Sequence, residues 1–169
     1  MRGRRPLPGL EVRPLGPGDR ERMASMFRRL SPESRFLRFN TPKPELTPRE
    51  LSYLTDVDHI RHVALAALDR RDGSIVGTAR YVEEADRPGV ADVAIEVVDE
   101  LQNRGIGTVL AAAVVERARE NGLAVLMATT QWDNRPARAL LRRLRFHTRA
   151  RERGELELEL ALAPSPGTP

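Results

Sequence analysis

The stretch Gln102–Gly107, which reads QNRGIG, has the residue types of a phosphate-binding loop. Its small residues leave backbone N–H groups uncovered, and apolar residues recur at helical spacing from Ile106 to the stop at Asn121-Gly122. A helix that begins in such a loop points free N–H groups and its positive dipole end outward. We therefore expect a phosphate or pyrophosphate to bind the backbone of Gln102, Asn103, Arg104, Gly105, Ile106, Gly107 and Thr108.

Two common phosphate-binding motifs do not fit this stretch. A P-loop needs a lysine directly before the serine or threonine, but Gly107 precedes Thr108. A dinucleotide fingerprint needs a third glycine, and Leu110 occupies that place. What remains is the pattern Q-x-x-G-x-G between an expected strand and an expected helix.

Two carboxylates, Asp92 and Glu96, stand on the segment just before this loop. Val90–Val98 is short and rich in β-branched residues, which predicts a strand. On a strand both carboxylates share one face and lie about 13 Å apart, at about 3.3 Å per residue, too far to act on one proton together. Each can serve as a general base, or can instead be solvated or paired with an arginine.

Apolar spacing also predicts the elements that position this centre. Alternating or β-branched runs indicate strands, Asp72-Gly73 indicates a tight hairpin turn, and capping residues followed by apolar residues three or four apart indicate helices. Strands are expected over residues 10–15, 63–68, 75–82, 90–98, 123–129 and 155–162, and helices are expected to begin near Asp19, Pro32, Thr47, Ile106 and Asn134.

Length and composition limit the class of protein. A chain of 169 residues with a 40% hydrophobic share suffices for one domain with its own core, expected over residues 1–163. The proline-rich residues 164–169 are expected to form a disordered tail.

Several function classes are excluded at this stage. Cysteine is absent, so disulfides, thiolate metal sites and a cysteine nucleophile are excluded. The net charge of +4 comes from arginines interleaved with acids, which argues against nucleic-acid binding. No apolar run approaches the roughly 20 residues that cross a bilayer, and no secretory signal is seen. We expect a cytoplasmic protein without a membrane, nucleic-acid or metal partner, as a monomer or a homodimer.

The Q-x-x-G-x-G pattern resembles the acetyl-CoA pyrophosphate loop of the GNAT superfamily of N-acetyltransferases. The expected order of strand, helices, three strands, helix, strand, helix and strand is similar to the order in that family. The segments LSPESRFLRF, TDVDHIRHVALAAL, IVGTARYV and ADVAIEVVDELQNRGIG resemble the catalytic domain of bacterial Pat-type protein lysine acetyltransferases. Those proteins usually carry a fused regulatory part, for which this sequence shows no counterpart.

The resemblance implies an α/β (α+β) fold with a twisted, mostly antiparallel mixed sheet of six to seven strands flanked by helices. It implies that acetyl-CoA binds in the splay after the central strand and gives its acetyl group to a primary amine. A protein lysine is the first choice of acceptor, and a small amine is the second. A non-catalytic acyl-CoA-binding sensor is the alternative from another functional class.

Transfer to an amine requires a base. The pKa of a lysine-like ammonium lies about 3.4 units above neutral pH. Its deprotonation at neutral pH therefore costs on the order of 4.6 kcal/mol if nothing helps. Glu96 lies nearer the thioester position implied by the family and is favoured slightly. Asp92 stands where the Pat-type pattern commonly has glutamate and is kept as the second candidate.

The resemblance also implies the acetyl-CoA contacts. A backbone N–H at Val97 or Val98 would stabilise the oxyanion, and Asn134 would contact the pantetheine arm. Arg138 could approach the phosphates or remain solvated. Leu141 replaces the tyrosine that many relatives use to protonate the leaving thiolate. His59 and His62 are expected to be structural and do not make a metal site.

Overall fold

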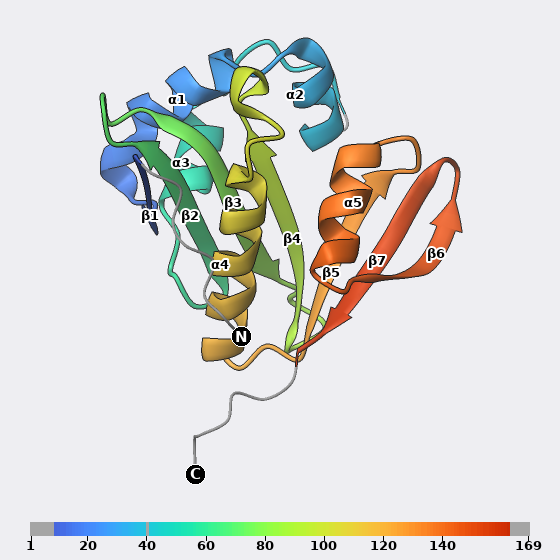
Figure 1. Cartoon of the computed structure of the whole chain (residues 1–169). Coiled ribbons are helices and arrows are strands. Elements are labelled where there is room, and N and C mark those ends of the chain that lie inside the picture. Colours follow the sequence, from blue (N-terminus) through green and yellow to red (C-terminus); the bar gives the residue numbers. More distant parts are fainter. Residues whose placement is uncertain (1–8, 40, 163–169) are drawn as a thin grey trace.

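The computed structural model describes residues 9–39 and 41–162, and these form one seven-stranded sheet with the order β1-β2-β3-β4-β5-β7-β6 (Figure 1). The strands are β1 (Leu10–Pro14), β2 (His62–Asp69), β3 (Ile75–Glu83), β4 (Val90–Val97), β5 (Val125–Gln131), β6 (His147–Glu152) and β7 (Glu155–Ala161). The helices are α1 (Arg20–Arg28), α2 (Pro32–Phe39), α3 (Pro48–Thr55), α4 (Ile106–Glu120) and α5 (Arg135–Arg143), with short 3₁₀ turns η1 (Pro17–Asp19) and η2 (Asp99–Leu101).

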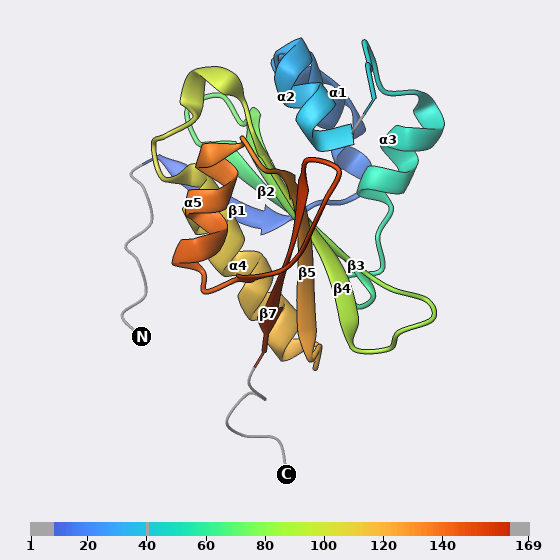
Figure 2. The ribbon, with the colours of Figure 1, turned by 90° about the vertical axis from the view of Figure 1, so that its right-hand side faces the viewer.

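Helices cover both faces of the sheet. Helices α1, α2 and α3 lie on one face, and α4 and α5 lie on the other (Figure 2). The central strands are therefore covered on both sides, which explains why β2 is an almost continuous apolar run and why Val63–Leu68 are all buried. The predicted fold, a mixed and mostly antiparallel sheet flanked by helices, is confirmed.

The sheet opens between β4 and β5. These two strands are parallel, as a crossover through α4 requires, and they pair only where Val90–Asp92 meet Val125–Met127. Beyond Asp92 the strands diverge, and the tips of β4 and β5 lie apart in Figure 1. All other neighbours in the sheet are antiparallel. The opening leaves the second half of β4 with one unpaired edge.

One strand has no counterpart among the segments predicted from sequence. All six residues of β6, HTRARE, are exposed, so the strand carries no alternating apolar pattern. Among the described strands it forms the outer edge of the sheet and pairs only with β7, and its arginines suit an exposed edge.

The predicted tail, residues 164–169, and both ends of the predicted domain fall outside the described residues. Within the part of the chain that is described, no helix is both long enough and apolar enough to cross a membrane.

Gly77 on β3 permits a close approach between α4 and the sheet. A Cβ at this position would lie 2.8 Å from the Glu96 carbonyl oxygen and 3.0 Å from Leu110 Cδ1. We expect Gly77→Ala to lower the free energy of unfolding by about 1–3 kcal/mol, because the backbone oxygen cannot move aside without disturbing the β3–β4 ladder. Urea denaturation measures this change.

Gly18→Ala is the matched control, since no heavy atom lies within 4 Å of a Cβ placed there and the backbone is not left-handed. It should change the stability by less than about 0.5 kcal/mol. Equal midpoints for the two variants would contradict the close approach at Gly77.

Candidate active site

The opening between β4 and β5 is a cleft of about 750 Å³. It is lined by α2, the exposed edge of β4, the loop that enters α4, the end of β5 and one face of α5. Segments from residue 30 to residue 143 thus meet at one place, and this place lies where the sheet topology leaves β4 unpaired.

The loop at the start of α4 is built to expose backbone N–H groups. Asn103 and Gly105 have positive φ angles of 60° and 87°, which turn the chain sharply into the helix. Gly105 is the N-cap and offers no side-chain cap, and the first backbone bond of the helix runs from the Val109 N–H to the Gly105 carbonyl. The N–H groups of Ile106, Gly107 and Thr108 therefore have no partner within the helix.

This loop fits a pyrophosphate. A Cβ at Gly107 would meet Leu140 at 3.6 Å and Val97 at 3.7 Å, so glycine keeps the floor of the cleft open between α4, α5 and β4. Gln102, Asn103, Gly105, Gly107 and Thr108 line the cleft. The Gln102 amide does not point its donor at a ligand position but donates to the Val97 carbonyl at 3.1 Å. Its side chain fixes the loop against β4.

The two backbone donors predicted for the oxyanion differ in their availability. The Val98 N–H donates to the Val76 carbonyl at 3.0 Å and is occupied by the sheet. Residues of an antiparallel strand alternate in direction, so the Val97 N–H points to the opposite edge, into the cleft. The bond from Gln102 to the Val97 carbonyl agrees with this direction, because both backbone groups of one residue face the same side.

Glu96 lies in a buried network of charges. Its side chain is 6% exposed, and its two carboxylate oxygens accept from the Arg38 guanidinium and from the Thr78 hydroxyl, the latter at 2.5 Å. Arg80 is buried beside it, donates to the Leu54 carbonyl at 3.1 Å, and leaves its Nε and Nη2 groups without a partner among the described residues.

The charges of this network decide the protonation of its members. Burial raises the pKa of Glu96. The opposing effects of Arg38, Arg80 and the Thr78 hydroxyl together outweigh burial, so the pKa lies below its ordinary value. Burial lowers the pKa of Arg80 to about 10, against the attraction of Glu96. Burial and the Arg80 charge lower the pKa of His62 to about 4, so this histidine is neutral near pH 7. Glu96 is thus ionised and firmly paired.

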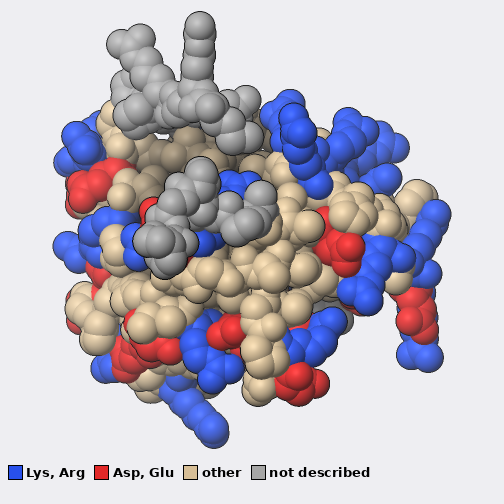
Figure 3. All heavy atoms as spheres, turned by 90° about the horizontal axis from the view of Figure 1, so that it is seen from below, with Lys and Arg blue, Asp and Glu red and all other residues tan. Residues whose placement is uncertain are grey.

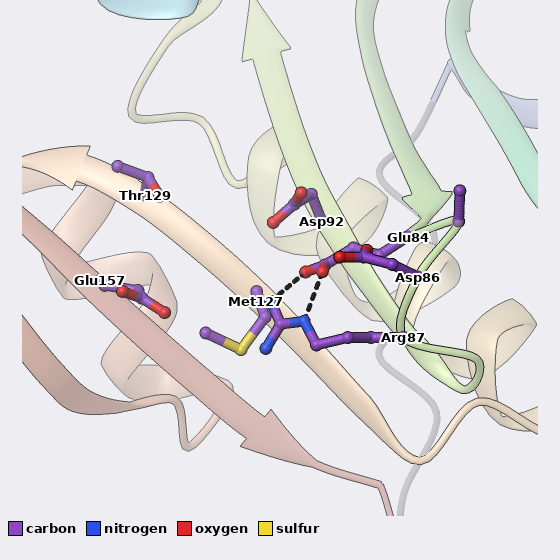
Figure 4. A pocket seen from close by; sticks show the side chains of 8 residues that line it. Glu84, Asp86, Arg87, Asp92, Met127, Thr129 and Glu157 are labelled. Carbon is purple, nitrogen blue, oxygen red and sulfur yellow. Dashed lines mark hydrogen bonds and ion pairs between the residues drawn. The ribbon is translucent and has the colours of Figure 1, made fainter.

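Asp92 occupies a different setting, at the base of the opening where β4 and β5 begin to diverge. It lines a pocket of about 450 Å³ together with Glu84 and Asp86 from the β3–β4 connection, Glu157 from β7, and Arg87 (Figure 4). Arg87 forms an ion pair with Glu84. The Asp92 side chain is exposed, but desolvation within the pocket raises its pKa, and so do Glu84 and Glu157, while Arg87 opposes them.

The residues predicted on α5 separate into two groups. Asn134 lines the cleft and caps the helix, since its side-chain oxygen accepts from the Ala137 N–H at 3.2 Å. Leu141 is buried and also lines the cleft. Arg138 is absent from the cleft lining and donates to the Trp132 carbonyl at 2.7 Å. Arg143, which the sequence analysis did not single out, lines the cleft instead.

The sequence analysis also missed the contacts that hold α2 over β4. Asp99 accepts from the Ser31 N–H and hydroxyl at 2.8 and 2.7 Å, and from the Ser34 hydroxyl at 2.8 Å. Together with the Arg38–Glu96 pair, these bonds join α2 to the strand and loop that form the cleft. The serine at the start of α2 was the available signal, but its partner lies 68 residues away.

The chain is similar in sequence to known acetyltransferases. The model of the Acetyltransferase (GNAT) family matches residues 24–146. The acetyltransferase PA5475 of Pseudomonas aeruginosa is 34% identical over 137 residues, which make up 80% of this chain and 73% of that protein. The acetyltransferase Pat of Mycolicibacterium smegmatis is 32% identical over 133 residues, which make up 79% of this chain but 40% of Pat.

Solved structures agree with the sequence relatives. The GNAT domain of Pat from S. lividans superposes with a TM-score of 0.84 at 28% identity, with 90% of each chain covered. YncA of Salmonella typhimurium, solved with its cofactor acetyl-CoA, shares the fold with a TM-score of 0.75 at 16% identity, with 92% of this chain and 95% of that chain covered. The predicted resemblance to GNAT and Pat-type domains is confirmed. The chain belongs to the GNAT family and is an acetyl-CoA-dependent N-acetyltransferase.

Proposed function

We propose that acetyl-CoA enters the cleft from the face that carries α4 and α5, and that a primary amine approaches its thioester from the opposite face. The single observation that carries this proposal is the unpaired edge of β4, which has the anion-binding loop at one end and the acid-lined pocket at the other. Thr129 on β5 lines both the cleft and the pocket, so the two are adjacent.

The pocket suits a protonated amine. Glu84, Asp86, Asp92 and Glu157 contribute four carboxylates, and Arg87 is the one basic residue among the pocket-lining side chains. The chain as a whole has a formal net charge of +4, so this acidic lining contrasts with the charge of the molecule. An acidic pocket raises the local concentration of a cationic acceptor.

We assign the proton acceptor to Asp92 and a positioning role to Glu96. The sequence favoured Glu96 slightly, but both of its oxygens accept hydrogen bonds and its pKa is lowered. Asp92 forms no such pair with another described residue, and its raised pKa makes it the stronger base of the two. Asp92 takes a proton from the ammonium through bridging water, because Val97 lies five residues further along β4, and the free amine then attacks the thioester carbonyl.

The remaining steps use backbone groups and water. The Val97 N–H stabilises the oxyanion of the tetrahedral intermediate. Asn134 keeps its side-chain amide donor for the pantetheine arm, because only its oxygen is used in capping α5. Leu141 has no proton to donate, so the thiolate leaves as an anion and is protonated by water, while the new amide nitrogen loses its extra proton to solvent.

We propose a protein lysine as the acceptor and a small amine as the second candidate. The support is the similarity to Pat of Mycolicibacterium smegmatis, of which this chain spans 40%. The test is free-thiol release from acetyl-CoA in the presence of lysine-containing proteins, lysine peptides and small diamines. Acetylation of a protein lysine, located by mass spectrometry, supports the first choice. Tight binding of acetyl-CoA without transfer to any acceptor on a broad panel would leave a non-catalytic sensor instead.

A further inference from the structure

Arginines gather on the surface formed by α5 and β6. Residues 135–153 contain eight arginines against one acid, Glu152, and all eight arginines are exposed. Basic side chains crowd the right-hand side of Figure 3, where α5 and β6 lie. We name these eight residues the arginine surface: Arg135, Arg138, Arg142, Arg143, Arg145, Arg149, Arg151 and Arg153.

Only one arginine of α5 reaches the cleft. Pro136, Leu140 and Arg143 follow one another at helical spacing on the face that lines the cleft, whereas Arg138 and Arg142 do not line it. Leu140 lies against the start of α4, since its Cδ2 is 3.6 Å from the Cβ position of Gly107. Arg143 is one turn further along the same face and is exposed to solvent.

Arg143 also differs from the other cation of the cleft. Among the described residues, Arg38 and Arg143 are the basic side chains that line the cleft. Arg38 is committed to Glu96, whereas Arg143 forms no ion pair or hydrogen bond with another described residue. The cleft therefore holds one uncommitted guanidinium among the described residues, and it lies one helical turn beyond Leu140, which meets the Gly107 position at the start of α4.

The chemistry of CoA supplies a matching group. Its pyrophosphate has the N–H groups of Ile106, Gly107 and Thr108 as partners, but its ribose carries a further, separate 3′-phosphate that needs a cation. We propose that Arg143 binds this 3′-phosphate and thereby selects CoA thioesters over pantetheine thioesters that lack the 3′-phosphate. This inference rests on the proposed function, because it requires acetyl-CoA in the same cleft. Guanidinium and phosphate form charge-assisted, often bidentate hydrogen bonds.

Isothermal titration calorimetry with CoA and with dephospho-CoA, which lacks only the 3′-phosphate, tests the assignment. We expect the wild-type protein to bind CoA about 10- to 100-fold more tightly than dephospho-CoA, the range of one hydrogen bond between charged groups. Arg143→Gln should bring this ratio close to 1 by weakening CoA binding while leaving dephospho-CoA binding almost unchanged. Arg142→Gln removes the same charge from the next position on α5 and should keep the wild-type ratio.

Each other result overturns the assignment. If Arg143→Gln lowers the affinities for CoA and for dephospho-CoA equally, Arg143 contacts the pyrophosphate instead. Equal effects of Arg142→Gln and Arg143→Gln would mean that the arginine surface acts only through its general field. Failure of the wild-type protein to bind CoA would remove the proposed function itself, and this outcome is separate from tight CoA binding that does not depend on the 3′-phosphate.

Discussion

Glu96→Ala is expected to lower the free energy of unfolding by about 3–5 kcal/mol. The carboxylate is buried between Arg38 and Arg80, and its removal leaves two guanidinium groups close together with no counter-charge between them. It also removes the partner of the buried Thr78 hydroxyl. Urea denaturation followed by circular dichroism measures the loss.

The matched control is Glu100→Ala. Glu100 also pairs with an arginine, Arg29, but the Glu100 side chain is 51% exposed, so its loss should cost less than about 1 kcal/mol. Arg38→Ala and the double variant Arg38→Ala/Glu96→Ala complete a double-mutant cycle. The double variant should be more stable than the sum of the single losses predicts, because it avoids one unpaired charge. Additive losses would show that Glu96 and Arg38 are not coupled.

The pH dependence of the stability follows from the lowered pKa of Glu96. The folded-state pKa of Glu96 lies below its ordinary value of 4.5, so its contribution is complete above that value and disappears as the pH falls through the folded-state pKa. We expect the stability difference between wild type and Glu96→Gln to shrink below about pH 4.5, measured as the difference in urea midpoints across an acid pH series. A difference that grows toward acid pH would mean that the folded state raises this pKa.

Local patterns explain which features could be predicted from the sequence. The strand before the loop, the glycine turn and the helix after it each depend on residues within a few positions, so β4, Gly105 and α4 follow from spacing alone. The wholly exposed strand β6 offers no apolar alternation, which is why it could not be recognised. Its position depends on pairing with β7 rather than on its own sequence.

The pairing of charged side chains could not be predicted in the same way. Arg38 and Glu96 are 58 residues apart, and only the packing of α2 against β4 brings them together. The choice between Arg138 and Arg143 depends on which face of α5 meets the cleft, and the alternation of arginines with apolar residues along this helix fits both. Side-chain roles at this site therefore require the tertiary structure, whereas the position of the glycine loop before α4 does not.

Asp92→Asn is expected to lower kcat/KM for an amine acceptor by about 10²- to 10⁴-fold, the usual contribution of a positioned general base. Asparagine keeps the shape of the side chain but cannot take the ammonium proton. Acetyl-CoA affinity should remain within about twofold, since Asp92 lies at the base of the opening, away from the loop that enters α4. Steady-state thiol release and calorimetric titration separate these two effects.

The pH profile distinguishes proton transfer from simple attraction of the acceptor. Asp92 acts only when ionised, and its pKa is raised above its ordinary value of 3.8, so wild-type kcat/KM should fall on the acid side of that raised pKa. In Asp92→Asn this acid limb should be lost, leaving only the ionisation of the amine. Asp86→Asn removes one negative charge from the same pocket and should mainly raise KM, with the acid limb retained. If Asp92→Asn keeps wild-type turnover while a folded Glu96→Gln loses it, the base is Glu96, and the Arg38 pair must open during each catalytic cycle.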